Sequence, residues 1–380
     1  MHKALGADAL PHIQAIAPYH GGRPISEVAR QFGLAERDIV KLASNENPLG
    51  MSPRGRQAMI QASEDLGRYP DGNGHDLKSA LQRRFGLAPE SITLGNGSND
   101  ILELVARAFL SVGKSSLFSA HAFAVYALAT QATGAKAIVV PARSEDLGHD
   151  LSAMRAAIQP DTAVVWVANP NNPTGSYLPP EALETFIASV PSATVVVLDE
   201  AYAEYLSPDE YIPSFEWVHR YPNLVVSRSF SKAYGLAGLR VGFGVANPVV
   251  TDLLNRVRQP FNVNSLAMAA ATESLFDEAF LRQTYELNAQ GLRYLSDALT
   301  ERGLRPLPSR GNFVLVDLRP RLSPSDARPA LGVWLFEQLM AKGVITRPVA
   351  NYGLPHHLRI SIGTRDEIDA FLKALDALLG

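Results

Sequence analysis

Four short runs of apolar residues, each followed closely by polar residues, constrain this chain more than any other feature of its sequence. The runs lie at residues 137–140, 163–168, 194–198 and 224–226. They are apolar nearly throughout rather than alternating, which is typical of strands covered on both faces of a parallel sheet. Helical patterns lie between the last three runs, near 180–189 and 213–220. The sequence therefore predicts an α/β fold built from repeated βαβ units.

The last third of the chain has a different pattern. A long helical stretch covers 265–302, strands are predicted at 313–316 and 357–362, and further helices at 329–342 and 365–379. This mixture predicts a second, smaller α+β domain. We therefore expect three regions: an N-terminal arm with part of the small domain over 1–50, a large domain over 51–262, and a small C-terminal domain over 263–380.

The composition narrows the class of protein. Lys and Arg number 35 and Asp and Glu number 38, a net charge of −3, whereas nucleic-acid or anionic-membrane binders normally carry a basic excess. Cys is absent, which excludes disulfides, thiolate zinc sites and a Cys nucleophile, and the nine His form no metal-like cluster. The sequence contains neither a signal-peptide pattern nor an apolar run of ~20 residues. We expect a cytoplasmic enzyme with no metal, nucleic-acid or membrane partner.

Three polar side chains lie at or just after the ends of the second, third and fourth apolar runs. They are an amide, Asn172, a carboxylate, Asp199, and an amine, Lys232. Right-handed crossovers should bring the ends of neighbouring parallel strands to one edge of the sheet. Ligands of open α/β sheets bind at that carboxyl edge. We therefore expect the three side chains to share one crevice, provided that the three strands are neighbours.

Lys232 is notable because the chain holds only 8 Lys against 27 Arg. It follows an apolar strand and precedes a Gly-rich loop at 235–242. A Lys that is desolvated near other cations has a lowered pKa and becomes a nucleophile suited to imine formation. The alternative for a single Lys is an ordinary surface residue in a turn.

The surroundings of Lys232 favour the chemical interpretation. Ser229, Ser231 and Arg240 are phosphate-binding groups, and residues 95–99 lead into a predicted helix at 101–110, whose N-terminus would bind an anion. A phosphorylated aldehyde cofactor needs an amine, donors for its phosphate and a carboxylate for a ring nitrogen. Pyridoxal 5'-phosphate meets that description, since its electron-sink chemistry requires a protonated pyridine nitrogen beside a buried anion.

Several segments resemble a known family. Residues 169–175 (NPNNPTG), 199–202 (DEAY) and 229–240 (SFSKAYGLAGLR) are similar to the signature blocks of fold-type-I pyridoxal-phosphate-dependent aminotransferases. More narrowly, residues 41–50, 68–72 and 358–364 resemble the histidinol-phosphate aminotransferase family. The blocks occur in family order over nearly the whole chain. The resemblance implies a large domain with a mostly parallel seven-stranded sheet sandwiched by helices, a smaller α+β domain, and a homodimer.

The resemblance also implies a role for each site residue. Lys232 would bind the cofactor aldehyde as an imine and later shuttle the substrate proton, and Asp199 would pair with the pyridine nitrogen. Phe123 would stack on the ring, and Asn172 and Tyr202 would contact its hydroxyl. The cofactor phosphate would be held by Gly97, Ser98, Asn99, Ser229, Ser231 and Arg240, together with Tyr69 of the partner subunit. The substrate would be bound by Tyr19, Asn45, Arg347 and Arg359, although Arg347 could equally be a surface residue.

Two positions depart from the family pattern. The usual Gly-Ser-Asp-Glu phosphate loop is Gly97-Ser98-Asn99-Asp100 here, and Phe123 stands where Tyr is common. Asn keeps a capping oxygen, so phosphate binding should persist. Phe keeps the stacking ring but loses the hydroxyl, which leaves the substrate preference open.

The resemblance implies a ping-pong aminotransferase of histidine biosynthesis, in which glutamate gives its amino group to the cofactor and imidazole-acetol phosphate receives it as histidinol phosphate. Three alternatives stay open at this point. The chain could prefer phenylalanine or tyrosine, could be a phosphothreonine-type decarboxylase on the same scaffold, or could be a non-catalytic cofactor-binding sensor. Turnover with glutamate would indicate an aminotransferase, and release of carbon dioxide would indicate a decarboxylase. A sensor would bind the cofactor and show neither activity.

Overall fold

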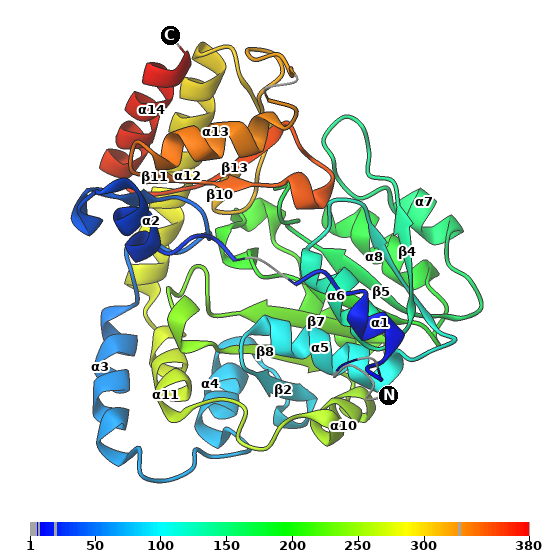
Figure 1. Cartoon of the computed structure of the whole chain (residues 1–380). Coiled ribbons are helices and arrows are strands. Elements are labelled where there is room, and N and C mark those ends of the chain that lie inside the picture. Colours follow the sequence, from blue (N-terminus) through cyan, green and yellow to red (C-terminus); the bar gives the residue numbers. More distant parts are fainter. Residues whose placement is uncertain (1–5, 7, 19–20, 326–327, 380) are drawn as a thin grey trace, which may run out of the picture.

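The computed structural model describes residues 6, 8–18, 21–325 and 328–379. A seven-stranded sheet dominates the larger body (Figure 1). Its strands, in spatial order, are β2 (Ile92–Gly95), β8 (Gly242–Ala246), β7 (Leu224–Ser229), β6 (Val195–Asp199), β5 (Thr162–Ala168), β3 (Ser115–Ser119) and β4 (Lys136–Val140). Only β8 runs antiparallel to its neighbours, and every other adjacent pair is parallel. The predicted mostly parallel seven-stranded sheet is therefore confirmed.

The central strands are apolar because both faces of the sheet are covered. Along β5, Val165 and Val167 belong to one core cluster, while Val164 and Trp166 belong to the other. Helices on the first face are α4 (His75–Phe85), α7 (Leu151–Ala156), α8 (Pro180–Ser189), α9 (Ser214–Arg220) and α11 (Ser265–Ser274). Helices on the second face are α5 (Ser98–Phe109), α6 (Ala124–Ala132) and α10 (Pro248–Val257). The run at 137–140 differs, because β4 is an edge strand and Val139 is 54% exposed.

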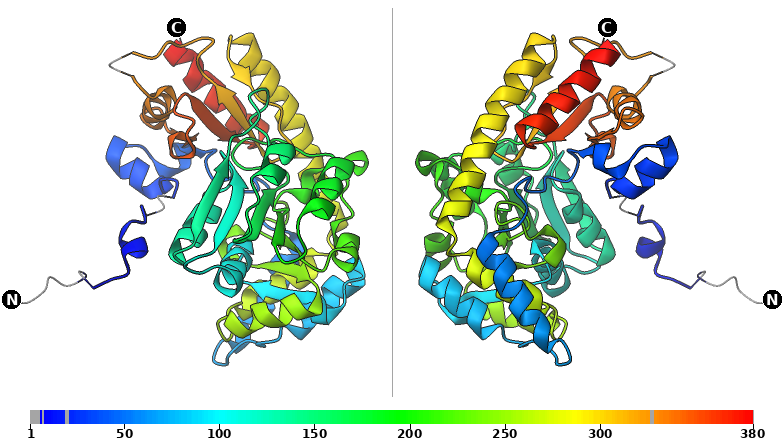
Figure 2. Two further views of the ribbon diagram at one scale, coloured as in Figure 1. Left: turned by 90° about the vertical axis from the view of Figure 1, so that its right-hand side faces the viewer. Right: turned by 90° about the vertical axis from the view of Figure 1, so that its left-hand side faces the viewer.

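The smaller body is built on a four-stranded antiparallel sheet. Its strands, in spatial order, are β12 (Arg347–Pro348), β13 (His357–Ser361), β10 (Phe313–Asp317) and β9 (Arg305–Pro306). Its apolar core comes from this sheet and from α12 (Glu278–Glu301), α13 (Leu331–Met340) and α14 (Arg365–Leu379). Figure 2 shows α12, in yellow, lying beside α14, in red.

The N-terminal region joins the smaller body. Here β1 (Val40–Lys41) pairs in parallel with β11 (Val344–Ile345), and α2 (Ile25–Phe32) packs its Val28 and Ala29 beside Met340 and Ile345. The remaining helices are α1 (Pro11–Gln14) and α3 (Pro53–Ala62). This pairing agrees with the expectation that the first fifty residues contribute to the small domain, although the domain division stays a prediction.

The helical stretch predicted over 265–302 is not continuous. It breaks between α11 and α12, where the Asp277 side chain accepts a hydrogen bond from the Phe280 N–H at 3.2 Å and so caps α12. The two helices serve different cores, since Ala270 of α11 packs with the large sheet and Leu295 of α12 packs with the small one. The predicted continuous helix is therefore wrong, while the predicted boundary at residue 262 stays a prediction.

Candidate active site

A cavity of about 270 Å³ lies where the larger body, the smaller body and the N-terminal region meet. It opens at the carboxyl ends of β5, β6 and β7, which are consecutive parallel neighbours. This adjacency is the condition on which the sequence argument depended. The cavity brings together most of the predicted site residues: Asn45, Ser98, Asn99, Phe123, Asn172, Asp199, Tyr202, Ser229, Ser231, Lys232, Arg240, Arg347 and Arg359.

Lys232 follows β7 and its amine lies in this cavity. Nζ donates a hydrogen bond to the Ser44 carbonyl oxygen at 3.1 Å. Burial, reinforced by the positive charge of Arg359, lowers the pKa of Lys232 to about 8. A substantial neutral fraction is therefore present slightly above neutral pH, and only the neutral amine is a nucleophile.

Asp199 ends β6 and lies in the same cavity. Its Oδ2 accepts a hydrogen bond from the Tyr126 hydroxyl at 2.9 Å, whereas its buried Oδ1 has no hydrogen-bond partner among the described residues. Burial raises the pKa of Asp199 to about 6, and the Tyr126 hydrogen bond opposes that rise. A buried carboxylate with one oxygen left over fits a protonated ring nitrogen, which would supply both a donor and a positive charge.

Anion-binding groups converge on the other end of the cavity. Helix α5 begins at Ser98, so its first backbone N–H groups lie beside Ser231 and Arg240. Gly97, which precedes the helix, has a φ of +85°, and a Cβ at this position would collide with the Arg240 guanidinium. Arg240 Nη1 in turn donates to Ser231 Oγ at 3.4 Å. These donors fit a phosphate group, and Gly97 lets the loop approach Arg240 closely enough to form the cradle.

Arg359 connects the small sheet to the site. It is 6% exposed, and its guanidinium donates to Asn172 Oδ1 at 2.5 Å and to the Ala43 carbonyl at 2.6 Å. Arg347 is its register partner on β12 and lines the same cavity. Two guanidinium groups at facing strand positions repel each other, so their placement favours an anionic ligand between them.

Asn45 lines the cavity and also takes part in the hydrogen bonding within the protein. Its Nδ2 donates to the Tyr202 hydroxyl at 2.9 Å, and its Oδ1 accepts from Ser361 Oγ at 2.8 Å. Both ends of the amide are thus used within the protein. Asn45 also has a φ of +55°, a conformation that Asn tolerates better than most residues. Asn45 orients Tyr202, and its amide keeps a second Nδ2 hydrogen and a second Oδ1 lone pair, so the predicted substrate contact stays a prediction.

Residues that the sequence argument did not single out complete the site. The backbone of segment 43–45 is one, because its carbonyl groups hold both Arg359 and Lys232. Tyr126 is another, and so is Ser361. Every residue type carries a backbone carbonyl, so the sequence does not indicate which carbonyls act as acceptors in the site. Tyr126 lies on a helix whose site-facing side cannot be predicted without knowing what the helix packs against.

Two of the predicted residues that the structure describes, Gly97 and Tyr69, do not line this cavity. Gly97 is next to it, as described, and the predicted residue Tyr19 falls outside the described residues. Tyr69 is 83% exposed and stacks on Phe261 with a centroid distance of 4.8 Å. Tyr69 therefore does not reach the site of its own chain. The described residues include no group of three or more His, Asp or Glu side chains arranged to hold a metal ion, and no described helix could cross a membrane.

The cradle can be tested at its glycine. Gly97→Ala should raise the Kd for pyridoxal phosphate about ten-fold, because the new Cβ displaces Arg240 and weakens one charged hydrogen bond. Titration of the apo-protein with the cofactor, followed by absorbance, measures this change. Gly113→Ala is the matched control, since Gly113 also has a φ of +85° but a Cβ there meets nothing within 4 Å. Equal effects of the two substitutions would mean that only backbone strain matters.

Known proteins are similar to this chain in sequence and in fold. The family model described as "Aminotransferase class I and II" matches residues 37–375. Histidinol-phosphate aminotransferase 2 of Ralstonia nicotianae is 58% identical over 97% of this chain and 96% of its own length. A crystal structure of histidinol-phosphate aminotransferase from Sinorhizobium meliloti in complex with pyridoxal-5'-phosphate superposes with a TM-score of 0.88, at 30% identity over 99% of this chain and 98% of that one. The chain therefore belongs to the class I and II aminotransferases.

Proposed function

We propose that this enzyme uses pyridoxal phosphate to transfer an amino group from glutamate to imidazole-acetol phosphate, which gives histidinol phosphate, in two ping-pong half-reactions. The observation that carries the proposal is one cavity holding a half-buried amine, a buried carboxylate, an anion cradle and two Arg. The relatives support the substrate, because those at 50–58% identity are named histidinol-phosphate aminotransferases.

The residues of the cavity divide the work. Bound pyridoxal phosphate supplies an electron sink that stabilises negative charge at the carbon bearing the amino group. Asp199 holds the ring nitrogen protonated, and the cradle at 97–99 with Arg240 holds the phosphate. Lys232 binds the cofactor and then takes and returns the proton at the substrate carbon. Its lowered pKa suits this task, because a base works best when its pKa lies near the working pH.

Both proposed substrates carry negative charge, and this agrees with the paired Arg347 and Arg359. Glutamate carries a second carboxylate where histidinol phosphate carries a phosphate. A planar guanidinium can bind either group through two parallel hydrogen bonds. The same pair of Arg can therefore serve both half-reactions.

A second candidate is an aromatic aminotransferase, because an apolar space adjoins the site. A cavity of about 810 Å³ shares Phe123, Arg347 and Tyr352 with the active site. Phe118 and Phe336 add to its apolar lining, which suits an aromatic side chain. The kcat/KM values for histidinol phosphate, phenylalanine and tyrosine decide between the two, and release of carbon dioxide from a phosphorylated amino acid would instead indicate the decarboxylase.

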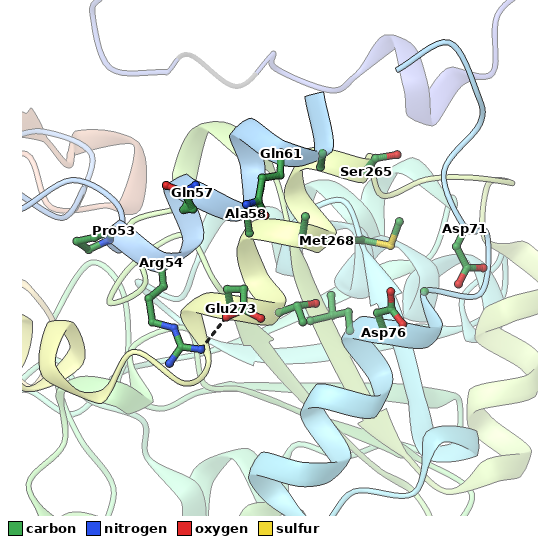
Figure 3. A pocket seen from close by; sticks show the side chains of 15 residues that line it. Pro53, Arg54, Gln57, Ala58, Gln61, Asp71, Asp76, Ser265, Met268 and Glu273 are labelled. Atoms are coloured by element: carbon green, nitrogen blue, oxygen red, sulfur yellow. Dashed lines mark hydrogen bonds and ion pairs between the residues drawn. The ribbon is translucent and has the colours of Figure 1, made fainter. Parts of the chain in front are cut away.

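We also propose that the enzyme is a homodimer in the cytoplasm. Ile60, Leu66, Tyr69 and Phe261 are large apolar residues that are 46–83% exposed. Beside them lies a cavity of about 870 Å³ between α3, α4 and α11, where Gln57, Gln61 and Met268 project (Figure 3). A second copy that covered this face would bury these side chains. It would also account for Tyr69, which the family resemblance assigns to the partner's cofactor phosphate.

Lys232→Ala should reduce turnover by about 10²–10⁴-fold or more, because the proton-transferring group is lost. The variant should also lose the covalent cofactor adduct that borohydride fixes in the wild-type protein, as followed by mass spectrometry. Lys78→Ala serves as the control, since Lys78 is a second partly desolvated Lys that does not line the cavity. A borohydride-fixed adduct in Lys232→Ala would assign the nucleophile to another residue.

Arg359→Lys should raise the KM for histidinol phosphate about ten-fold, since a point charge replaces a forked guanidinium contact. Steady-state kinetics with each substrate measures this change, and kcat should fall less than kcat/KM. Arg256→Lys is a suitable control because its side chain is 71% exposed on α10. An unchanged KM would place anion recognition elsewhere.

The dimer proposal predicts a particle of about twice 41.1 kDa in analytical ultracentrifugation. Leu66→Arg combined with Ile60→Arg should give monomers, because like charges would face each other across a two-fold interface. Val249→Arg is the control, as Val249 is 71% exposed on α10. A monomeric wild-type enzyme with full activity would contradict the proposal.

A further inference from the structure

Tyr126 is a fully buried residue of α6 whose ring is held on two sides. It stacks on Trp166 of β5 with a centroid distance of 5.3 Å and an interplanar angle of 5°. Phe123, which faces the active-site cavity, meets it edge-on at 5.9 Å and 86°. The ring is therefore fixed between the central sheet and an aromatic residue that lines the site.

This packing places the Tyr126 hydroxyl within hydrogen-bond distance of Asp199 Oδ2. The Tyr126 hydroxyl donates to Asp199 Oδ2 at 2.9 Å, and no other side-chain bond to Asp199 is present among the described residues. Because Oδ2 accepts this hydrogen bond, rotation of the carboxylate is restricted, and Oδ1 is left to bind a ligand. A carboxylate without this bond could rotate about χ2 and lose that alignment.

The charges around Asp199 explain why such a bond matters. Glu200 comes directly after β6, and Tyr202 lies nearby on the same following segment. Lys232 lines the same cavity after β7, and His149 is hydrogen-bonded to the neighbouring β5 residue Ala168. Burial and Glu200 both disfavour the ionised carboxylate, whereas the hydrogen bond from Tyr126 favours it. The pKa of Tyr126 itself is raised well above its ordinary value, so the hydroxyl keeps its proton and remains a donor.

We infer that Tyr126 is a positioning residue for the transfer reaction: its hydroxyl holds the Asp199 carboxylate in the orientation and charge state that bind the ring nitrogen of the cofactor. The inference rests on the proposed function, because it needs Asp199 to face that nitrogen. Tyr126 is fully buried and does not line the cavity, so it acts through Asp199.

The test is the pH dependence of cofactor affinity in Tyr126→Phe, which removes one oxygen and keeps the ring on Trp166. The Kd for pyridoxal phosphate should rise about ten-fold at pH 8, because the loss of a hydrogen bond to a charged group weakens the anchor. The acid limb of the affinity profile should move to higher pH by about one unit, since an unsupported carboxylate protonates earlier. Absorbance titration of apo-protein between pH 5 and 9 measures both without relying on turnover.

Two further variants make the result specific. Tyr177→Phe removes a hydroxyl bonded to the Glu210 carbonyl, away from the cavity, and should leave the profile unchanged. In an Asp199→Asn background, Tyr126→Phe should have almost no additional effect, because the amide has no ionisation to support. Tyr126→Met, which fills a similar volume with no hydroxyl, gives the same test if Tyr126→Phe is insoluble.

The outcomes separate this inference from the proposed function. A wild-type profile in Tyr126→Phe, a shift of equal size in Tyr177→Phe, or an undiminished effect in the Asp199→Asn background would overturn the role of Tyr126. The first two results would leave the assignment of Lys232 intact, since that rests on the borohydride-fixed adduct. Absence of any cofactor binding by the wild-type protein would instead overturn the proposed function.

Discussion

The parallel pairing of β5, β6 and β7 is the constraint on which the site depends. Their carboxyl ends lie at one edge of the sheet because the three neighbouring strands run parallel. Asn172, Asp199 and Lys232, which are 60 positions apart from first to last, are thereby placed in one cavity. The two faces of the sheet are buried under helices, so the edge is the part of the central strands that a ligand can reach.

Burial acts on the two ionisable groups of this cavity in opposite directions. It lowers the pKa of Lys232 to about 8 and raises that of Asp199 to about 6, so desolvation moves both groups toward their neutral forms. Pyridoxal phosphate, the cofactor that fits the cavity, has a group that suits each of these two side chains. The neutral amine of Lys232 would bind the cofactor's aldehyde, and the Asp199 carboxylate would hold a protonated ring nitrogen. The desolvation that shifts both pKa values is thus the property that suits these side chains to such a ligand.

The sequence predicted the elements whose signals are local. Continuous apolar runs identified the buried strands, and polar residues at their ends identified the core of the cavity. Features that depend on residues far away in the sequence were harder to predict. The break between α11 and α12 is set by the Asp277 cap and by two different cores. The use of Asn45 within the protein depends on Tyr202 and Ser361, which lie 157 and 316 positions away. No spacing rule relates such residues, because only the assembled fold brings them together.

Segment 43–45 has a consequence for any redesign of the N-terminal region. Three consecutive residues contact Arg359, Lys232 and Tyr202, and their position is fixed by the pairing of β1 with β11 just upstream. A slip of that two-residue pairing by a single step would carry the whole segment about 3.3 Å along the strand direction. The hydrogen bonds that position Arg359, Lys232 and Tyr202 would then be lost together. This two-stranded pairing therefore sets the geometry of three site contacts at once. Insertions or deletions upstream are tolerable only where they leave its register unchanged.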